Sequence, residues 1–416
     1  MEESLHDLIY DWNVADEKPI HPGRRIEFDD ETLRDGLQSP SVKDPSIEQK
    51  VQALHFMNEI GIDSADIGLP GAGSHVQATV RRLAEEIRDQ KLNIAANCAA
   101  RTHENDVRPI AEISQQVGIP IEACTFIGSS PIRQFAEGWD LDWIIEQAVK
   151  AVKFAIEEGL PVMMVTEDTI RAKPGDIERI FTAAIDAGAS RVCCCDTVGH
   201  ATPWGARNLV RFVRKVADAA NPEVKVDWHG HSDRGLGVIN TIAAIEGGAD
   251  RVHACALGIG ERVGNTPLDQ LMVNLRLMGW IENDLTAMAG YLDLVSEATG
   301  VAIPDQYPIF GRDAFRTGTG VHAAAIIKAR KKGSEWLADR VYSGVPAGLF
   351  GLRQIIEVGP MSGLSNVICW LEENGYPQEE DLAKEIFQQA KSSNRILADK
   401  ELHDTAKRWE EAQASN

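Results

Sequence analysis

Short apolar runs alternate with longer amphipathic runs from Arg24 to about Gly279. The short runs are rich in β-branched residues and are bounded by turn residues, which predicts strands. The longer runs repeat their apolar positions at helical spacing and often end at glycine, which predicts helices. The expected strands are residues 24–30, 64–69, 91–98, 120–128, 161–167, 190–196, 223–231 and 250–258, and the clearest helices are residues 46–61, 140–159 and 174–188.

Eight strand–helix repeats in succession predict a parallel sheet closed into a (β/α)₈ barrel, the TIM-barrel class of α/β fold. We assign this barrel to residues 23–285. The alternative is an open, doubly wound sheet, which uses the same alternation. Barrel enzymes keep their chemistry at the carboxyl ends of the strands, so polar residues that follow the expected strands are the candidates for a site.

The rest of the chain lacks the strand–helix alternation. We expect an N-terminal extension over residues 1–22, a helical linker subdomain over residues 286–335 and a C-terminal subdomain over residues 336–416. These accessory parts are predicted to be mainly helical.

Composition and charge narrow the classes of partner. The 416 residues are 44% hydrophobic and 25% charged, as in ordinary globular proteins. A formal net charge of -21 makes nucleic acid and anionic membranes unsuitable partners. It does not exclude a small anionic substrate, because local arginines or a metal can reverse the field inside one cleft. The acidic N-terminus has no signal-peptide pattern, and no apolar run is long enough to span a bilayer.

The seven cysteines have no Cys-x-x-Cys spacing and their number is odd. Both features favour reduced thiols in a cytoplasmic protein over a disulfide framework. Three of them, Cys193, Cys194 and Cys195, are consecutive in an expected strand. Because successive strand residues point to opposite faces, these three cannot converge on one metal, and core packing is predicted for them.

A metal site is predicted from four residues that follow neighbouring strands. His229 and His231 lie two apart at the end of one strand, so both imidazoles project to the same face. Asp35 follows the first strand and Asn265 follows the eighth, and barrel closure brings both strands next to the seventh. A mixed set of oxygen and imidazole donors suits a divalent catalytic metal. The alternative for the histidines is a hydrogen-bonded pair without a metal.

Three further polar residues belong to the same predicted rim. Arg34 stands beside Asp35 and could stabilise negative charge that develops on a substrate oxygen. Glu167 follows the fifth strand and Thr197 the sixth. The alternatives are a structural ion pair for Arg34 or Glu167 and a helix cap for Thr197.

Four segments together resemble one enzyme family. ETLRDGLQSP, DTVGHATP, HGHSDRGLGVINTIAAIEGGADRV and GIGERVGN occur in this order. The combination resembles the family that contains 2-isopropylmalate, homocitrate and citramalate synthases and, more distantly, 3-hydroxy-3-methylglutaryl-CoA lyase. The resemblance covers the expected barrel and continues more faintly through TGTGVHAAAI.

The resemblance implies a role for each matching position. Asp35, His229 and His231 match the family's metal ligands, and Asn265 matches a fourth ligand or its near neighbour. Arg34 matches the arginine that contacts the 2-oxo group. The implied metal is Mg²⁺ or Mn²⁺, although two imidazoles would also accept Zn²⁺ or Co²⁺.

The resemblance also implies the substrate-side residues. Glu167 matches an active-site glutamate, Thr197 a hydroxyl that holds the substrate carboxylate, and Gln38 a substrate-site glutamine. His322 matches a histidine that reaches an active site, often that of the partner subunit, and a role in proton transfer is implied for it. Without the resemblance, the alternative for His322 is a residue at the N-terminus of a helix that follows a glycine-rich bend.

The implied activity is a condensation of acetyl-CoA with a 2-oxo acid, followed by thioester hydrolysis, in a homodimer. The favoured acceptor is 2-oxoisovalerate, as in the 2-isopropylmalate synthases of leucine biosynthesis, and homocitrate or citramalate synthesis is the alternative. A lyase is a further alternative, although the related lyase carries a cysteine in the loop that reads GIGERVGN here. A catalytically inactive binding protein is the remaining one.

Three departures from the family pattern concern the substrate. Leu37 replaces a polar or acidic residue, Arg133 replaces a histidine, and Ala99 is smaller than expected for a branched-chain pocket. Arg133 could pair with a second substrate carboxylate, which would favour 2-oxoglutarate and homocitrate synthesis, or it could form a structural ion pair. We expect no leucine-regulatory domain after the C-terminal subdomain.

Overall fold

Eight parallel strands close into a barrel in chain order, and β8 pairs back onto β1. The structure is a computed structural model that describes residues 8–15 and 21–414. The predicted (β/α)₈ fold is confirmed, and each strand overlaps its predicted run. The strands are β1 (Glu27–Asp30), β2 (Ser64–Asp66), β3 (Ala95–Arg101), β4 (Ile121–Gly128), β5 (Val162–Glu167), β6 (Arg191–Asp196), β7 (Lys225–Gly230) and β8 (Arg251–Ala254).

The strand β3 is displaced from its prediction, which covered residues 91–98. Pairing with β4 extends it to Arg101, which lies opposite Phe126. The residues added are Ala99, Ala100 and Arg101, whose side chains carry no strong strand preference. Backbone pairing between neighbours therefore sets the end of this strand, not local composition.

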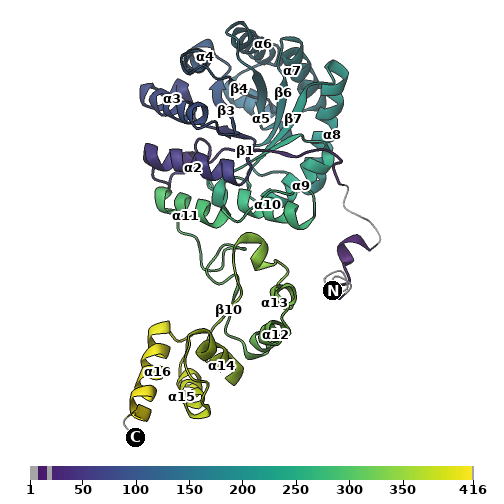
Figure 1. Ribbon diagram of the computed structural model, residues 1–416. Helices are drawn as coiled ribbons and strands as arrows, with labels where there is room; N and C mark the ends of the chain where they lie inside the picture. The colour runs from purple at the N-terminus through teal and green to yellow at the C-terminus, as the bar shows by residue number, and fades with distance from the viewer. Residues whose placement is uncertain (1–7, 16–20, 415–416) are drawn as a thin grey trace. The chain divides into compact units, whose positions relative to one another are not determined.

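A helix follows each strand and packs outside the barrel (Figure 1). Helix starts follow the expected chemistry. Ser46 accepts a hydrogen bond from the backbone of Gln49 in a capping box, and Asp140 accepts one from Trp143. The barrel helices are α2 (Ile47–Glu59), α3 (Ser74–Asp89), α4 (Glu104–Val117), α5 (Pro131–Glu137), α6 (Leu141–Glu157), α7 (Pro174–Asp186), α8 (Pro203–Ala220), α9 (Gly237–Gly247), α10 (Leu268–Leu277) and α11 (Met288–Thr299).

The strand β7 buries apolar side chains on its outer face and polar ones inside the barrel. In β7, Val226 and Trp228 are fully buried and alternate with Asp227 and His229. Asp227 bonds to Arg251 across the interior, so the alternating apolar residues face the helices. The apolar core of this unit therefore lies mainly between the strands and the helices.

The floor of the barrel is a buried network of charges. Arg251, 4% exposed, lies 2.6 Å from Asp227 and 2.7 Å from Glu122. Arg191 lies 2.8 Å from the second oxygen of Asp227. Burial alone would raise the pKa of Asp227, but the two guanidinium groups hold it well below its usual value. Each buried charge thus has an opposite charge within contact, which is what makes its burial tolerable.

The described chain divides into two compact units. Residues 21–302 form the barrel unit, and residues 303–414 with residues 8–15 form the accessory unit. Residues 1–7 and 16–20 of the expected N-terminal extension lie outside the described residues. The described part of that extension contains one 3-10 turn, Trp12–Val14.

The accessory unit is mainly helical and has its own core. Val358, Trp370, Leu382 and Leu402 are buried together, and Trp370 stacks on Tyr376. A parallel pair of two-residue strands was not predicted, because runs this short leave no periodicity. The elements are β9 (Arg316–Thr317), α12 (Gly320–Lys331), α13 (Glu335–Arg340), β10 (Ile355–Ile356), α14 (Leu364–Glu373), α15 (Glu380–Lys391) and α16 (Asp399–Ala414).

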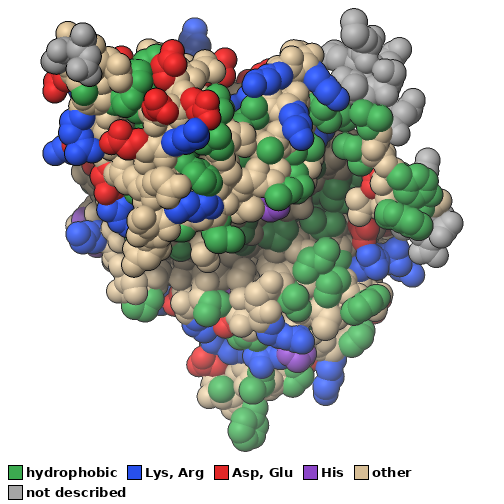
Figure 2. All heavy atoms as spheres, turned by 90° about the horizontal axis from the view of Figure 1, so that it is seen from below, with side chains coloured by type: hydrophobic (Ala, Val, Ile, Leu, Met, Phe, Trp, Pro, Cys, Tyr) green, Lys and Arg blue, Asp and Glu red, His purple; other side chains and the backbone are tan. Residues whose placement is uncertain are grey.

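The exposed surface mixes both signs of charge. On the face drawn in Figure 2, acidic side chains are interspersed with lysines, arginines and hydrophobic groups. This face therefore has no extended field of one sign, although the whole chain carries a net charge of -21. Among the helices within residues 8–15 and 21–414, none has the length and apolar content needed to cross a bilayer.

Candidate metal centre and substrate pocket

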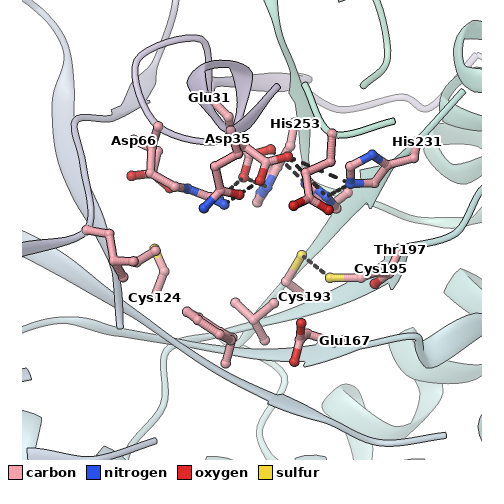
Figure 3. A pocket seen from close by; sticks show the side chains of 18 of the residues that line it. Glu31, Asp35, Asp66, Cys124, Glu167, Cys193, Cys195, Thr197, His231 and His253 are labelled. Atoms are coloured by element: carbon pink, nitrogen blue, oxygen red, sulfur yellow. Dashed lines mark hydrogen bonds and ion pairs between the residues drawn. The ribbon is translucent and has the colours of Figure 1, made fainter. Parts of the chain in front are cut away.

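One pocket opens at the carboxyl ends of the barrel strands, where the sequence predicted a site. The strands and the loops that follow them supply its walls (Figure 3). Most of the predicted site residues line it: Arg34, Asp35, Gln38, Glu167, Thr197, His229 and His231.

Three predicted metal ligands converge in this pocket. The Nε2 atoms of His229 and His231 lie 3.0 Å apart. Oδ2 of Asp35 lies 3.9 Å from the first and 3.7 Å from the second. All three side chains are buried, and each offers one donor atom to the same point. One carboxylate and two imidazoles form a donor set for a divalent metal.

Glu31 fixes the orientation of His229. Its Oε2 lies 2.7 Å from Nδ1 of His229, which directs the Nε2 atom of that ring toward Asp35. Burial would raise the pKa of Glu31, but the imidazoles of His229 and His253 and the guanidinium of Arg34 hold it well below its usual value. An ionised carboxylate behind a metal-binding imidazole is the usual outer partner of such a ligand.

One buried atom without a partner supports metal binding. Oδ1 of Asn265 accepts no hydrogen bond within the described chain. Nε2 of His231 is the ring atom that faces His229 and Asp35. Burial, followed by the charge on His229, lowers the pKa of His231 to about 4, so its ring is neutral. A neutral imidazole and an unused amide oxygen are metal donors. The residues present therefore fit a divalent metal.

A glycine-rich loop places Asn265 beside Asp35. The Nδ2 atom of Asn265 lies 2.8 Å from Oδ2 of Asp35, and its backbone bridges to His231. Gly264, at φ +97°, could not carry a side chain, because a Cβ would lie 1.8 Å from the carbonyl oxygen of Gly258. The loop after β8 is therefore folded tightly enough to bring its asparagine into the cluster.

Arg34 is held by three carboxylates at the edge of the metal cluster. Its Nε lies 2.6 Å from Asp66, its Nη1 2.7 Å from Asp35 and its Nη2 2.9 Å from Glu31. A guanidinium has five N–H donors, so two remain for another acceptor. Burial raises the pKa of Asp66 to about 7 despite the nearby charge of Arg34. The guanidinium of Arg34 is thus held in place, and two of its N–H groups remain free to donate to a ligand.

Glu167 and Thr197 lie on the opposite wall from Asp66 (Figure 3). Burial raises the pKa of Glu167. Oγ1 of Thr197 accepts a hydrogen bond of 2.8 Å from the backbone of Asp168, which leaves its hydroxyl proton available to a ligand. Asp168 has a left-handed backbone, with φ of 58°, at the point where β5 turns away from the pocket.

Three predicted residues are not part of the pocket lining: Asn265, which contacts Asp35 from the loop after β8, and Arg133 and His322. Arg133 lies 3.8 Å from Glu167 and 3.4 Å from Glu137, with its guanidinium over the ring of Trp139. It therefore forms the ion pairs that were the alternative to substrate binding. His322 belongs to the accessory unit, where it is exposed in the first turn of α12 and its ring stacks on Tyr342.

Other pocket residues had no role in the sequence prediction. Asp66 is the last residue of β2, Glu31 follows β1, and His253 lies inside β8, where it contacts Glu31 at 3.1 Å. A polar residue at an inward position of a barrel strand was the available signal. Arg262 lines the pocket and donates to Asp233 and to the carbonyl of Thr197. Cys193 and Cys195 line it as well, and the core packing predicted for them is confirmed, because both are buried and pack with Cys124 and Met163.

Sequence and structure comparisons find synthases and lyases that are similar to this chain. A homocitrate synthase from Methanopyrus kandleri is 30% identical over 92% of this chain and 90% of its own length. A 2-isopropylmalate synthase from Pyrococcus abyssi is 32% identical over 93% of this chain and 76% of its own length. The HMG-CoA lyase structure from Bacillus subtilis superimposes with a TM-score of 0.56, at 18% identity, over 68% of this chain and 96% of that chain, which supports the barrel fold.

The family model named HMGL-like matches residues 25–295, which include the whole barrel and every metal ligand proposed above. Curated relatives of the chain include 2-isopropylmalate, homocitrate and citramalate synthases. The resemblance stated from the sequence motifs is therefore confirmed at the level of the family. The chain belongs to the HMGL-like family.

Proposed function

We propose that this protein condenses acetyl-CoA with a 2-oxo acid and then hydrolyses the thioester, in a reaction that requires a divalent metal. One observation carries the proposal. Arg34, with two unused donors, lies directly beside the donor cluster of Asp35, His229 and His231. A 2-oxo acid presents adjacent carboxylate and keto oxygens, which match a metal and a neighbouring guanidinium.

Four residues would hold the metal: Asp35, His229, His231 and Asn265. When bound, the metal supplies Lewis acidity to the keto group of the acceptor. Arg34 donates hydrogen bonds to the same oxygen, so negative charge that develops there during carbon–carbon bond formation is stabilised. Its three carboxylate partners keep the guanidinium from moving toward bulk water.

The remaining roles concern carboxylate binding and proton transfer. The free hydroxyl proton of Thr197 and the amide of Gln38 suit the acceptor's carboxylate. Two groups remain candidates for removing the methyl proton of acetyl-CoA. Glu167 has a pKa raised by burial, which makes it a stronger base than a free glutamate. His322 is supported by the family resemblance alone.

The acceptor that the pocket favours is 2-oxoisovalerate, which makes 2-isopropylmalate synthesis the preferred activity. The wall away from the metal cluster includes the apolar side chains of Ala99, Phe126 and Val165. A second substrate carboxylate, as in 2-oxoglutarate, would need a free cation there. Arg133 is engaged outside the lining, and Arg262 is paired with Asp233. Homocitrate and citramalate synthesis remain the alternatives.

The test measures thiol release from acetyl-CoA with 2-oxoisovalerate, 2-oxoglutarate and pyruvate supplied separately. Release that requires Mn²⁺ or Mg²⁺ and stops with chelator supports the condensation, and the preferred acid identifies the synthase. No release with any of the three acids would contradict it. Cleavage of 3-hydroxy-3-methylglutaryl-CoA would instead favour the lyase alternative.

A homodimer is part of the proposal. Large apolar side chains are exposed in loops and helices that follow three barrel strands: Phe135 is 90% exposed, Trp204 70% and Val263 61%. Exposed apolar groups of this size are typical of contact surfaces. Sedimentation equilibrium tests this point, and a fully active monomer would contradict it.

A further inference from the structure

Two thiols face each other on the inner side of β6. Cys193 and Cys195 occupy alternate positions of the strand, and their Sγ atoms lie 3.9 Å apart. Both line the pocket and are buried in the protein, with exposures of 0% and 3%. Cys194, between them, points to the opposite face of the strand. Only two of the three consecutive cysteines therefore share one side.

The thiol pair is separate from the proposed Mg²⁺ or Mn²⁺ site. The donor atoms of that site come from the loops after β1 and β8 and from the end of β7, whereas the thiols belong to β6. Figure 3 places Cys193 and Cys195 together below the group that contains Asp35 and His231. The pair packs with Cys124, Met163 and Val165, so its surroundings are soft and apolar.

The spacing of the sulfur atoms distinguishes a metal ligand pair from a disulfide. Two metal–sulfur bonds of about 2.3 Å at a tetrahedral angle place the sulfurs about 3.8 Å apart, close to the spacing found. A disulfide requires about 2.0 Å between the sulfurs. It would also span alternate strand residues whose Cα atoms are about 6.6 Å apart, near the upper limit for such a bond.

The protonation of the thiols also favours metal binding over oxidation. Burial raises the pKa of Cys193 well above its usual value. The hydrogen bond with Cys193 lowers the pKa of Cys195, but burial and the nearby negative groups together raise it. Neutral thiols react slowly with peroxides, so this pair is poorly suited to act as an oxidation sensor. A thiophilic cation displaces thiol protons on binding, and it does not need a thiolate beforehand.

We propose that Cys193 and Cys195 form a binding site for a thiophilic d¹⁰ metal ion, such as Zn²⁺, Cd²⁺ or Cu⁺, in the wall of the pocket. Binding of a divalent ion forms two metal–sulfur bonds and releases two thiol protons to solvent, with no change in oxidation state. The remaining coordination positions face the pocket, where water or a ligand can fill them. Soft sulfur donors select such ions over Mg²⁺ and Mn²⁺.

Occupation of this site would narrow the pocket. A metal and its outer ligands would occupy the space beside Phe126 and Val165 that we assign to the acceptor's alkyl group. Thiophilic ions are therefore inhibitors of the condensation, and this consequence alone depends on the proposed function. The existence of the site does not depend on it.

The binding test uses Cd²⁺ as the probe. Reduced, full-length protein is first saturated with Mg²⁺ and then titrated with Cd²⁺ without oxygen. The ultraviolet charge-transfer absorption of the thiolate–cadmium bond is followed, and equilibrium dialysis gives the stoichiometry. Oxygen and imidazole donors do not produce this absorption, so it reports the thiol pair. Cd²⁺ can also replace Mg²⁺ at the site of Asp35, His229 and His231, so we expect the unmodified protein to bind one more Cd²⁺ per chain than Cys193→Ser does.

Matched variants come from the same strand. Cys193→Ser and Cys195→Ser each remove one sulfur and are expected to weaken Cd²⁺ binding at least about 10-fold, with loss of the absorption. Cys194→Ser, on the opposite face, is the control and should keep both. Cys195→Ala provides a second variant without a buried hydroxyl. Retained Mn²⁺ binding shows that a variant is folded.

Each outcome of these titrations and assays either supports or overturns the thiol site. An absent absorption in the unmodified protein, or an equal effect of Cys194→Ser and Cys193→Ser, would overturn the thiol site. If Cd²⁺ binds as expected and also stops CoA release in the unmodified protein but not in Cys193→Ser, both the site and its effect are supported. If no CoA release occurs under any condition, the proposed function fails while the binding result still decides the site.

Discussion

The Nδ1 atom of His229 lies 2.7 Å from Oε2 of Glu31, so the carboxylate sets the tautomer and the direction of the imidazole. The same carboxylate group lies 2.9 Å from Arg34 through its other oxygen. One buried side chain therefore aligns both a proposed metal ligand and the proposed oxyanion donor. Four predictions test residues of the pocket and of the charged network at the barrel floor.

Replacing Glu31 by glutamine should weaken metal binding. Loss of the charge behind His229 lowers the basicity of its Nε2 atom, and the expected loss of Mn²⁺ affinity is about 10- to 100-fold. Isothermal titration with Mn²⁺ measures it. Glu261→Gln is the matched control, because Glu261 lines the pocket but is exposed and pairs with Arg262. Equal affinities for the two variants would contradict the prediction.

Replacing Arg34 by lysine should impair the chemical step more than metal binding. A lysine ammonium cannot reproduce the planar fork that contacts Glu31, Asp35 and Asp66 while donating to substrate. We expect kcat to fall about 100- to 1000-fold. Steady-state assays of CoA release measure it, with Arg101→Lys as the control, because Arg101 bonds to Asp106 and does not line the pocket. A similar loss in the control would show that the effect is not specific to the pocket.

Enlarging Ala99 should change the choice of acceptor. This side chain is 3% exposed and lines the pocket, so added methyl groups take up space for the substrate's alkyl part. Ala99→Val should lower kcat/KM for 2-oxoisovalerate relative to pyruvate by about 10-fold or more. The ratio of two acids in one variant cancels any loss of folded protein. An unchanged ratio would remove Ala99 from the acceptor's binding surface.

Removing Arg251 should destabilise the barrel. Arg251→Met leaves Asp227 and Glu122 buried with less compensation, and the expected loss in the free energy of unfolding is about 3–5 kcal/mol. Arg179→Met is the control, since its pair with Asp142 is exposed and should contribute less than about 1 kcal/mol. Urea unfolding followed by circular dichroism compares them. Equal midpoints would mean that the network adds no net stability.

Much of the fold could be predicted because eight strand–helix units leave strong periodic signals. The position of His229 and His231 at alternate residues was enough to place both rings on one side. The role of Glu31 could not be predicted, because it depends on contacts with β7 and β8, about 200 residues away in the chain. A single sequence gives no measure of such long-range contacts.

The thiol pair illustrates a different limit. The sequence shows three consecutive cysteines in a strand, and their alternation was correctly used to exclude a three-sulfur site. Core packing is confirmed for all three, which are buried, but the sequence did not show that Cys193 and Cys195 also line the pocket. Alternate residues of a barrel strand face inward. Which set does so depends on the register of pairing with the neighbouring strands, for example Cys195 with His229. Composition does not reveal that register.

In β7, apolar side chains face the helices and polar side chains face the barrel interior. The two sets of positions should therefore differ in the substitutions that they tolerate. A systematic substitution scan of residues 226 to 231 should show a two-residue rhythm. Val226 and Trp228 should tolerate other side chains of similar volume, whereas Asp227, His229 and His231 should tolerate hardly any change in chemistry. The outward side chains of this strand can therefore be changed to adjust stability without altering the groups that line the pocket.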